Sequence, residues 1–223
     1  MSHASTTRPS AIAPPRSAGA ALRVFYRHLS PWILTIASVS AVSWRLTLGD
    51  WSVWDGVIAL ALFAWWPFQE WLIHVYLLHF RPVTIAGIRI DPPNARKHRM
   101  HHRDPNRIPL TFIPVHTFVT TLPALVVGSL LLFPTLALAA TCVATFTVLS
   151  LHYEWCHYLA HIPWTPNVGY YRRICHAHNL HHHRHEQRWF GVSRTFADRV
   201  LGTDPDVAST ERSPTVRTLG IPL

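Results

Sequence analysis

The sequence predicts an all-α integral membrane protein with about four transmembrane helices. Two features of the composition and one of the pattern lead to this fold class. Only 14% of the 223 residues are charged, whereas soluble domains carry roughly a quarter. Hydrophobic residues make up 49% and include ten tryptophans, a residue type enriched at membrane–water interfaces. Along the chain, long apolar stretches alternate with basic loops.

Four crossings follow from the apolar stretches, because a helical span needs about 20 residues. The first stretch runs from Pro31 to Leu48 and the second from Gly56 to Phe80. A third and a fourth crossing come from one apolar run of 42 residues, Thr111 to His152. Such a run is long enough to cross twice, and we expect it to reverse near Phe133 and Pro134.

The two ends of the chain are expected to lie outside the membrane domain. Residues 1–22 are rich in Ser, Thr, Ala and Pro, which is typical of a disordered tail. They lack the apolar core and cleavage site of a secretory signal peptide. Residues 206–223 are expected to form a C-terminal tail, which leaves 23–205 as the membrane domain. Three widely spaced cysteines exclude a disulfide scaffold.

The basic residues predict the orientation of these spans. Of the 20 lysines and arginines, 19 fall on one side, and Arg45 is the exception. By the positive-inside rule this side is cytoplasmic, together with both termini and the loop 81–109. Orientation and attraction to anionic headgroups explain the net charge of +9. Without a DNA- or RNA-binding motif, no nucleic-acid partner is expected. The membrane is either a bacterial plasma membrane or the endoplasmic reticulum.

Four clusters of histidines fall on the same predicted side. In three of them the histidines recur at helical spacings of three and four residues, so helices place them on shared faces. The clusters are His74 and His79; His98, His101 and His102; His157 and His161; and His178, His181 and His182. Neutral imidazole is a donor suited to Fe, Zn, Cu or Ni. Because one zinc ion takes only three or four protein ligands, ten histidines predict a site for two metal ions in a cytosolic helical cap. Asp91, Pro92 and Pro93 supply a start for the helix that carries the second cluster.

Three carboxylates are candidates for a supporting role at this site. Glu70 precedes His74 by one turn and could accept its second ring proton, and Glu154 or Asp198 could serve another histidine. A single histidine at a helix end is more often a headgroup contact than a ligand, so we assign no metal role to three others: His3, His28 and His116. Weaker candidates than the ten are His152, His176, His183 and His185.

The ordered set of motifs resembles the membrane-bound fatty acid hydroxylase/sterol desaturase superfamily, most closely the fatty acid 2-hydroxylases. The resemblance covers over half of the chain, from about Glu70 to Thr203. The matching segments are Glu70-Trp-Leu-Ile-His74-Val-Tyr-Leu-Leu-His79, His98-Arg-Met-His101-His102, Tyr153-Glu154-Trp-Cys-His157-Tyr158-Leu-Ala-His161, His178-Asn-Leu-His181-His182, Phe190-Gly191-Val-Ser193 and Asp198-Arg-Val-Leu-Gly202-Thr203.

This resemblance implies an iron- and O2-dependent lipid hydroxylase in which the ten clustered histidines bind two iron ions, or zinc as a substitute. The chemistry is expected at the metal centre, and no separate catalytic side chain is identified. The implied substrate is an acyl chain of a fatty acid or lipid, with sterol desaturation or carotenoid hydroxylation as alternatives in the same superfamily. Electrons are expected from a separate carrier, such as cytochrome b5 or a ferredoxin with its reductase, because the sequence contains no cytochrome b5 domain. The basic cytosolic face suits an acidic carrier.

A different class of protein, a membrane metal transporter or metal-binding protein, is the remaining alternative. Ionisable residues at mid-depth of a span mark ion paths in transporters. The predicted spans here hold few acidic residues, which disfavours this class.

Overall fold

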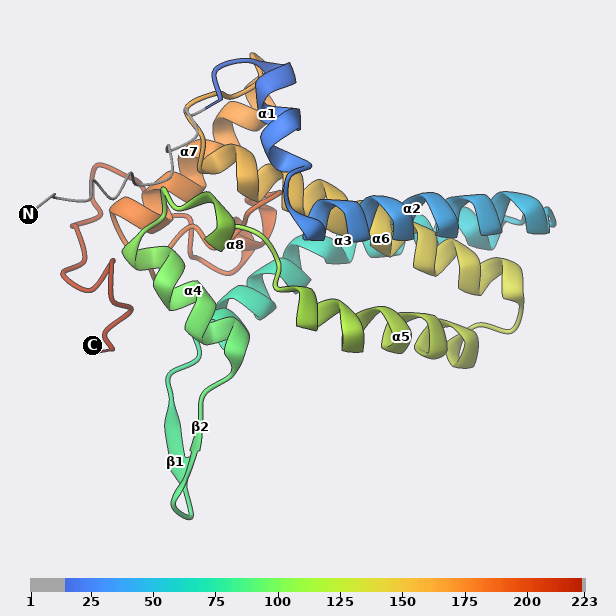
Figure 1. The fold of residues 1–223 in the computed structure, drawn as a ribbon, viewed down its shortest axis with the longest axis horizontal. Coiled ribbons are helices and arrows are strands. Elements are labelled where there is room, and N and C mark those ends of the chain that lie inside the picture. The colour runs from blue at the N-terminus through green and yellow to red at the C-terminus, as the bar shows by residue number, and fades with distance from the viewer. Residues whose placement is uncertain (1–14, 222–223) are drawn as a thin grey trace, which may run out of the picture.

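The computed structural model describes residues 15–221, and in this part of the chain the protein is mostly helical (Figure 1). Four long helices lie along one another as an elongated bundle, and a group of shorter elements covers one end. The bundle consists of α2 (Leu29–Leu48), α3 (Val53–Leu72), α5 (Val115–Leu132) and α6 (Leu136–Ala160). The shorter helices are α1 (Ala18–Phe25), α4 (Pro93–Arg103), η2 (Ile108–Leu110), α7 (Gly169–His183) and α8 (Phe196–Val200).

Helix α6 is the centre of the bundle and packs against α2, α3 and α5. Its first half buries a series of small residues, including Ala137, Ala140 and Ala144. Small side chains let neighbouring helix backbones approach closely, which is the usual basis of packing between helices in a membrane. The reversal between α5 and α6 lies at 133–135, where the sequence predicts it.

Within residues 15–221, three segments are long and apolar enough to cross a membrane: Val53–Leu78, Ile108–Leu132 and Leu136–Ala160. They correspond to the second, third and fourth stretches of the sequence analysis. The first stretch forms α2, a helix of 20 residues that packs along α6. Four serines and Arg45 lower the mean hydropathy of α2. This helix is therefore not among the three segments apolar enough to cross a membrane.

Arg45 is the one basic residue predicted on the side opposite to the other 19. It lies at the end of the bundle remote from α7 and is buried there. Its guanidinium is 2.8 Å from the Asp55 carboxylate of α3. It also donates a hydrogen bond of 2.7 Å to the Thr141 hydroxyl of α6. A buried charge needs such partners because removal from water is otherwise very unfavourable. The pair therefore joins three helices while it neutralises the charge.

The prediction of a purely helical protein is wrong at one place. Strands β1 (Val83–Ile85) and β2 (Ile88–Ile90) form an antiparallel hairpin that projects from the capped end (Figure 1). The turn residues Ala86 and Gly87 have φ values of 51° and 78°. Such a turn with positive φ at both positions matches the twist of the paired strands, and the flanking β-branched residues favour extended backbone.

Segments from both ends of the chain pack at the capped end of the bundle. Of the tail predicted over 1–22, residues 1–14 lie outside the described residues, and α1 begins at Ala18. The Tyr158 hydroxyl of α6 donates a hydrogen bond of 3.0 Å to the carbonyl of Ala21 in this helix. In the C-terminal segment, the Ser213 amide donates to the Arg184 carbonyl at 2.8 Å. The division of the chain at 22/23 and 205/206 stays a prediction.

Candidate metal centre

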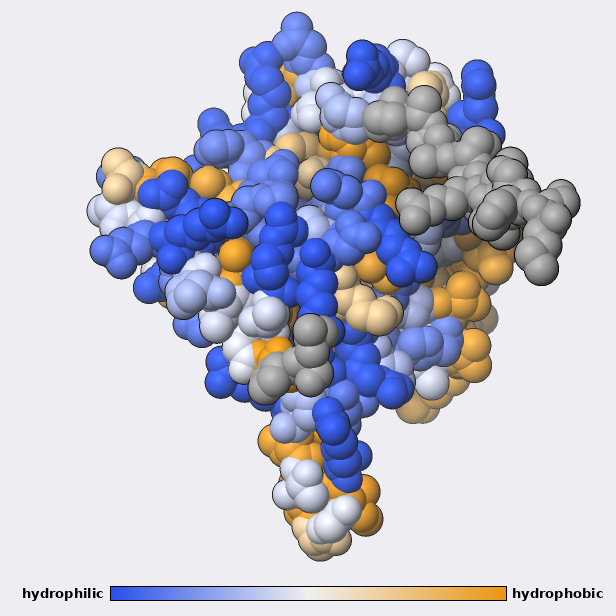
Figure 2. Space-filling model, turned by 60° about the vertical axis from the view of Figure 1, so that its left-hand side comes forward, coloured by the Kyte–Doolittle hydropathy of each residue, from blue (hydrophilic) through white to orange (hydrophobic). Residues whose placement is uncertain are grey.

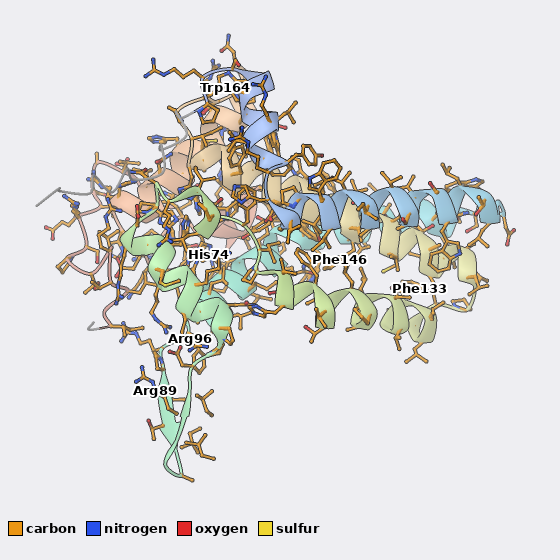
Figure 3. The ribbon with its side chains drawn as sticks, viewed as in Figure 1. His74, Arg89, Arg96, Phe133, Phe146 and Trp164 are labelled. Carbon is orange, nitrogen blue, oxygen red and sulfur yellow. The ribbon has the colours of Figure 1, made fainter. Side chains whose placement is uncertain are left out.

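The ten histidines of the four sequence clusters come together at the capped end of the bundle, where Figure 3 labels His74. They form two groups of five, and within each group the potential ligand nitrogens lie within 4.8 Å of one another. The first group consists of His74, His79, His98, His102 and His181. The second group consists of His101, His157, His161, His178 and His182.

Each H-x2-H-H motif contributes to both groups. On α4, His98 and His102 belong to the first group and His101 to the second. Helix α7 has the reverse pattern, because its i, i+4 pair His178 and His182 belongs to the second group and His181 to the first. The two groups adjoin, since the rings of His102 and His182 have centroids only 4.2 Å apart. The arrangement is therefore one site with two adjacent centres.

A π-helical turn positions the two histidines that follow α3. The turn η1 (Ile73–Leu78) continues α3, and the His79 amide donates to the His74 carbonyl at 3.0 Å. In an α-helix, residues five apart point in different directions, whereas an i→i+5 turn brings them onto nearly the same face. This local widening explains how two histidines separated by four residues both reach the first group.

The ring nitrogens face one another in a way that hydrogen bonding does not explain. His102 Nε2 and His181 Nε2 lie 3.1 Å apart. The Nδ1 of His102 is 3.1 Å from the Val216 carbonyl, and that of His181 is 2.7 Å from the Arg188 carbonyl. A carbonyl only accepts, so each Nδ1 carries the proton of its neutral ring, and each Nε2 is left with a lone pair. Two lone pairs at this distance repel each other, so the arrangement suits a cation between them.

The spacing of these nitrogens fits a bound metal ion. Imidazole nitrogens bind a metal such as zinc at about 2.1 Å, so two ligands at a right angle are about 3.0 Å apart. In the first group, His98 Nε2 is 3.1 Å from the Nε2 atoms of both His74 and His102. In the second group, His161 Nε2 is 3.1 Å from those of His101 and His178. Both groups therefore suit a metal ion, and together they suit a dimetal site.

The surroundings keep these histidines in the neutral form that binds metals. Burial lowers the pKa of His98 and His181 well below the usual value, and neighbouring histidines lower it further. Burial likewise lowers the pKa of His102 to about 3. An imidazole must lose its second proton before it can bind a metal. Because burial keeps these rings neutral at neutral pH, protons do not compete with a metal ion for their nitrogens.

Backbone carbonyls orient three of the rings, a feature that sequence reasoning missed. Besides the bonds of His102 and His181, the Nδ1 of His74 lies 2.7 Å from the Phe190 carbonyl. Such partners fix the tautomer and orientation of a metal-binding histidine. Every residue has a carbonyl, so nothing in the sequence marks these three. Val216 even lies in the segment expected to be a tail.

The structure gives Glu70 a different partner from the one expected. Its carboxylate does not hold His74, whose Nδ1 is bonded to Phe190. Instead, it accepts hydrogen bonds from the amides of Val192 and Ser193 at 3.3 and 3.0 Å, and from the Ser193 hydroxyl. Glu70 thus fixes the loop that supplies the Phe190 carbonyl to the His74 ring.

Asp198 and Glu154 also hold backbone rather than histidine rings, among the residues that the structure describes. Asp198 accepts from the amides of Phe190 and Gly191 at 2.8 and 2.7 Å. Glu154 accepts from the Ile113 amide at 3.1 Å and from the Ser30 hydroxyl. Asp198 therefore fixes the other side of the loop 190–193, while Glu154 ties α2 and the segment before α5 to α6.

Replacing Gly191 by alanine is expected to weaken metal binding roughly 10- to 100-fold, the usual range for a lost outer partner. A Cβ at this position would lie 2.1 Å from the Arg194 carbonyl oxygen and 2.7 Å from the Asp198 carboxylate. The loop would have to move, and the Phe190 carbonyl with it. Gly169→Ala is the matched control, because its Cβ meets nothing within 4 Å. Metal content after dialysis against a graded chelator series measures the effect, and equal retention in both variants would contradict this role of the loop.

The other histidines that the structure describes lie apart from both groups. The ring of His152 is 3.3 Å from the Tyr170 hydroxyl, His116 is bonded to Asn94, and His28 stacks on Phe112. The rings of His176 and His183 are exposed, and His185 lies beside Glu186. His3 falls outside the described residues.

An apolar cavity of about 250 Å³ lies beside the histidines, between α3, α5 and α6. Its wall includes one histidine from each group, His98 and His157. From there it extends along the bundle to Phe146, which Figure 3 labels. Most of the wall is aliphatic or aromatic, and this composition suits a hydrocarbon chain.

The structure thus combines a bundle with three candidate membrane spans, two adjoining groups of five mostly buried histidines that suit a dimetal site, and an apolar cavity beside them. A family model described as "Fatty acid hydroxylase" matches residues 59–203. The chain belongs to this fatty acid hydroxylase family and is thus an oxidoreductase of the hydroxylase type.

The comparison with solved structures supports the same fold. The chain is similar to a structure described as full-length Scs7p, in which only the hydroxylase domain is visible. The TM-score is 0.65 at 21% identity, over 82% of this chain and 70% of that chain. None of the curated protein sequences compared with this chain matches it.

Proposed function

We propose that this protein is an iron- and O2-dependent hydroxylase that inserts a hydroxyl group into an acyl chain of a fatty acid or lipid. The observation that carries the proposal is the position of the cavity. Because His98 and His157 line it, a chain bound there has a C–H bond next to both histidine groups at once. Proximity of this kind converts a bound alkyl chain into an oriented reactant.

In this proposal the ten histidines hold two iron ions, with zinc as a substitute. Neutral imidazoles suit iron and zinc alike. When bound, the two ions supply the activation of O2 and the oxidation of the C–H bond. The overall reaction consumes O2, two electrons and two protons, and it yields the alcohol and water.

The protein's own residues orient the proposed metal ligands and surround the substrate. The carbonyls of Phe190, Arg188 and Val216 hold the rings of three proposed ligands in one orientation. Apolar side chains of α3, α5 and α6 surround the alkyl chain. A dry cavity prevents side reactions with water at the oxidising centre.

Electrons are proposed to come from a separate carrier, such as cytochrome b5 or a ferredoxin with its reductase. Figure 2 shows that much of the capped end is hydrophilic. Exposed arginines, including Arg172 and Arg173 on α7, lie on this end. A basic surface speeds the encounter with an acidic carrier and selects its orientation.

We place the capped end, with both termini and the loop 81–109, in the cytoplasm of a bacterium or on the cytoplasmic side of the endoplasmic reticulum. In this arrangement α2 is a fourth crossing. Its length, its packing along α6 and the pairing of Arg45 with Asp55 support this position.

The orientation predicts the accessibility of two exposed positions at the capped end, 106 and 211. In intact cells, Asn106→Cys and Glu211→Cys should react with a membrane-impermeant maleimide only after permeabilisation, because both face the cytoplasm. The three native cysteines are buried, so the wild type serves as the background. Labelling of either variant in intact cells would contradict the proposed orientation.

Lipid profiling of cells with and without the protein tests the proposed reaction. We expect acyl lipids that have gained one oxygen atom in cells with the wild type, and none above background with His157→Ala. His116→Ala is the control, because its ring is exposed and bonded to Asn94. Lipids that have lost two hydrogens would indicate a desaturase instead, and oxidised sterols or carotenoids would identify the other substrate classes. Unchanged lipids in the presence of an electron donor would contradict hydroxylation.

A further inference from the structure

The β-hairpin 83–90 has one entirely apolar face, and the described part of the chain leaves this face exposed. Its cross-strand pairs are Val83 with Ile90, Thr84 with Arg89, and Ile85 with Ile88. Side chains alternate between the two faces of a strand, and directly paired residues share a face. The first and third pairs are therefore on one face, and Thr84 and Arg89 are on the other.

This apolar face is strongly exposed. The exposed fractions are 60% for Ile85 and 69% for Ile88, and 40% and 41% for Val83 and Ile90. An isolated two-stranded hairpin is only marginally stable in water, and four adjacent β-branched side chains exposed to water favour aggregation. A face of this kind is stabilised when another hydrophobic surface covers it.

The position of the hairpin identifies that surface as the lipid bilayer. The span Val53–Leu78 ends five residues before Val83, a distance of at most about 18 Å. Figure 1 shows the hairpin extending across the direction of the bundle helices, hence along the plane of a membrane that the bundle crosses. In Figure 3, Arg89 points away from the bundle, so the apolar face points toward the side on which the membrane lies.

The end of the neighbouring span exposes further apolar side chains, and the hairpin carries basic residues. At the end of the span, Leu72, Ile73 and Tyr76 are exposed, the last by 65%. Arg89 on the opposite face of the hairpin is 70% exposed, and Arg81 beside β1 is exposed as well. Basic side chains at this depth are attracted to anionic headgroups.

The base of the hairpin is fastened to the histidine helix α4. Arg99 of this helix donates to the Asp91 carboxylate at 2.6 Å and to the Phe80 carbonyl at 3.1 Å. These two acceptors lie at the two ends of the hairpin, and Arg99 directly follows His98. Arg99 therefore connects both ends of the hairpin to the histidine helix.

We propose that hairpin 83–90 is a membrane anchor whose apolar face inserts into the leaflet on the histidine side, with Arg89 at the headgroups. Through Arg99 this anchor sets the depth of α4 relative to the bilayer. The cavity lies at the same level, because its wall includes Leu77 and Leu78 before the hairpin and Asn94 and Lys97 after it.

Site-directed fluorescence on the full-length protein tests the anchor. Single cysteines at positions 85 and 88 on the apolar face, and at position 84 as the matched control on the opposite face, carry an environment-sensitive dye. The protein is reconstituted in vesicles of phosphatidylcholine and phosphatidylglycerol. Lipids brominated on their acyl chains should quench the dye of Ile85→Cys and Ile88→Cys several-fold more than that of Thr84→Cys. Aqueous iodide should show the opposite order.

Two outcomes would overturn the proposal. Equal iodide quenching at all three positions would place the hairpin in water. Protection of positions 85 and 88 from both quenchers would place the apolar face against protein, as in a strand-to-strand dimer. Elemental analysis of the same samples reports whether the metal site is intact, so the result does not depend on the proposed hydroxylase reaction.

Discussion

Replacing His182 by alanine is expected to abolish lipid oxidation, whereas replacing the next residue, His183, is expected to leave it intact. The His182 ring is buried in the second group, and its Nε2 lies 3.0 Å from that of His178. The His183 ring is exposed on the outer side of α7, where its Nδ1 is 3.2 Å from the Arg217 guanidinium. Loss of an outer partner of a metal ligand typically reduces activity about 10- to 100-fold. Loss of a proposed ligand itself should exceed the upper end of that range.

The pair is a close control because the two residues share a helix, a residue type and a sequence neighbourhood. Product formation is measured by mass spectrometry in reconstituted vesicles with an electron donor, and bound metal is measured in the same preparations. The circular dichroism spectrum of each variant should retain the wild-type helix content. Equal activity of His182→Ala and His183→Ala would remove the second histidine group from the reaction.

Filling the cavity is the second change with a large expected effect. Ser150 lies on the α6 face that also carries Tyr153 and His157, and all three line the cavity. A tryptophan at position 150 would occupy part of the roughly 250 Å³ that the alkyl chain needs. We expect kcat/KM for long acyl chains to fall at least 10-fold, which corresponds to about 1.4 kcal/mol of transition-state stabilisation. Shorter chains should be affected less.

The matched control is Val148→Trp, because Val148 is on the same helix but is 45% exposed on the bundle surface. Both variants should retain the wild-type metal content, since neither position contributes to the histidine groups. An unchanged kcat/KM in Ser150→Trp, or an equal loss in Val148→Trp, would show that the substrate does not use this cavity.

The long helices of this fold could largely be predicted from the sequence, because the apolar stretches outside the first are long enough to specify spans. The hairpin was missed although the alternation around Ala86 and Gly87 is a hairpin signal. Its β-branched residues lie in a short segment between two strongly helical regions. The helical pattern on both sides therefore hid the strand pattern of these few residues. The partner of Arg45 could not be predicted either, since helix packing decides which carboxylate it meets.

All ten histidines that the sequence analysis selected lie in the two groups, but their division could not be predicted. Spacing shows that His98, His101 and His102 share a helix face. It does not show that His101 belongs to the second group while His98 and His102 belong to the first. The packing of the neighbouring helices decides this division. The contact between His74 and the Phe190 carbonyl could not be predicted either. That carbonyl comes from a segment 116 residues further along the chain.

Elemental analysis of the purified full-length protein is the most direct test of a dimetal centre. The geometry of the two groups predicts two metal ions per wild-type chain. It further predicts that His181→Ala and His182→Ala, although adjacent in sequence, each weaken a different centre, because the first belongs to one group and the second to the other. A stoichiometry of one metal ion or none per wild-type chain, after loading with iron under reducing conditions, would contradict the dimetal assignment.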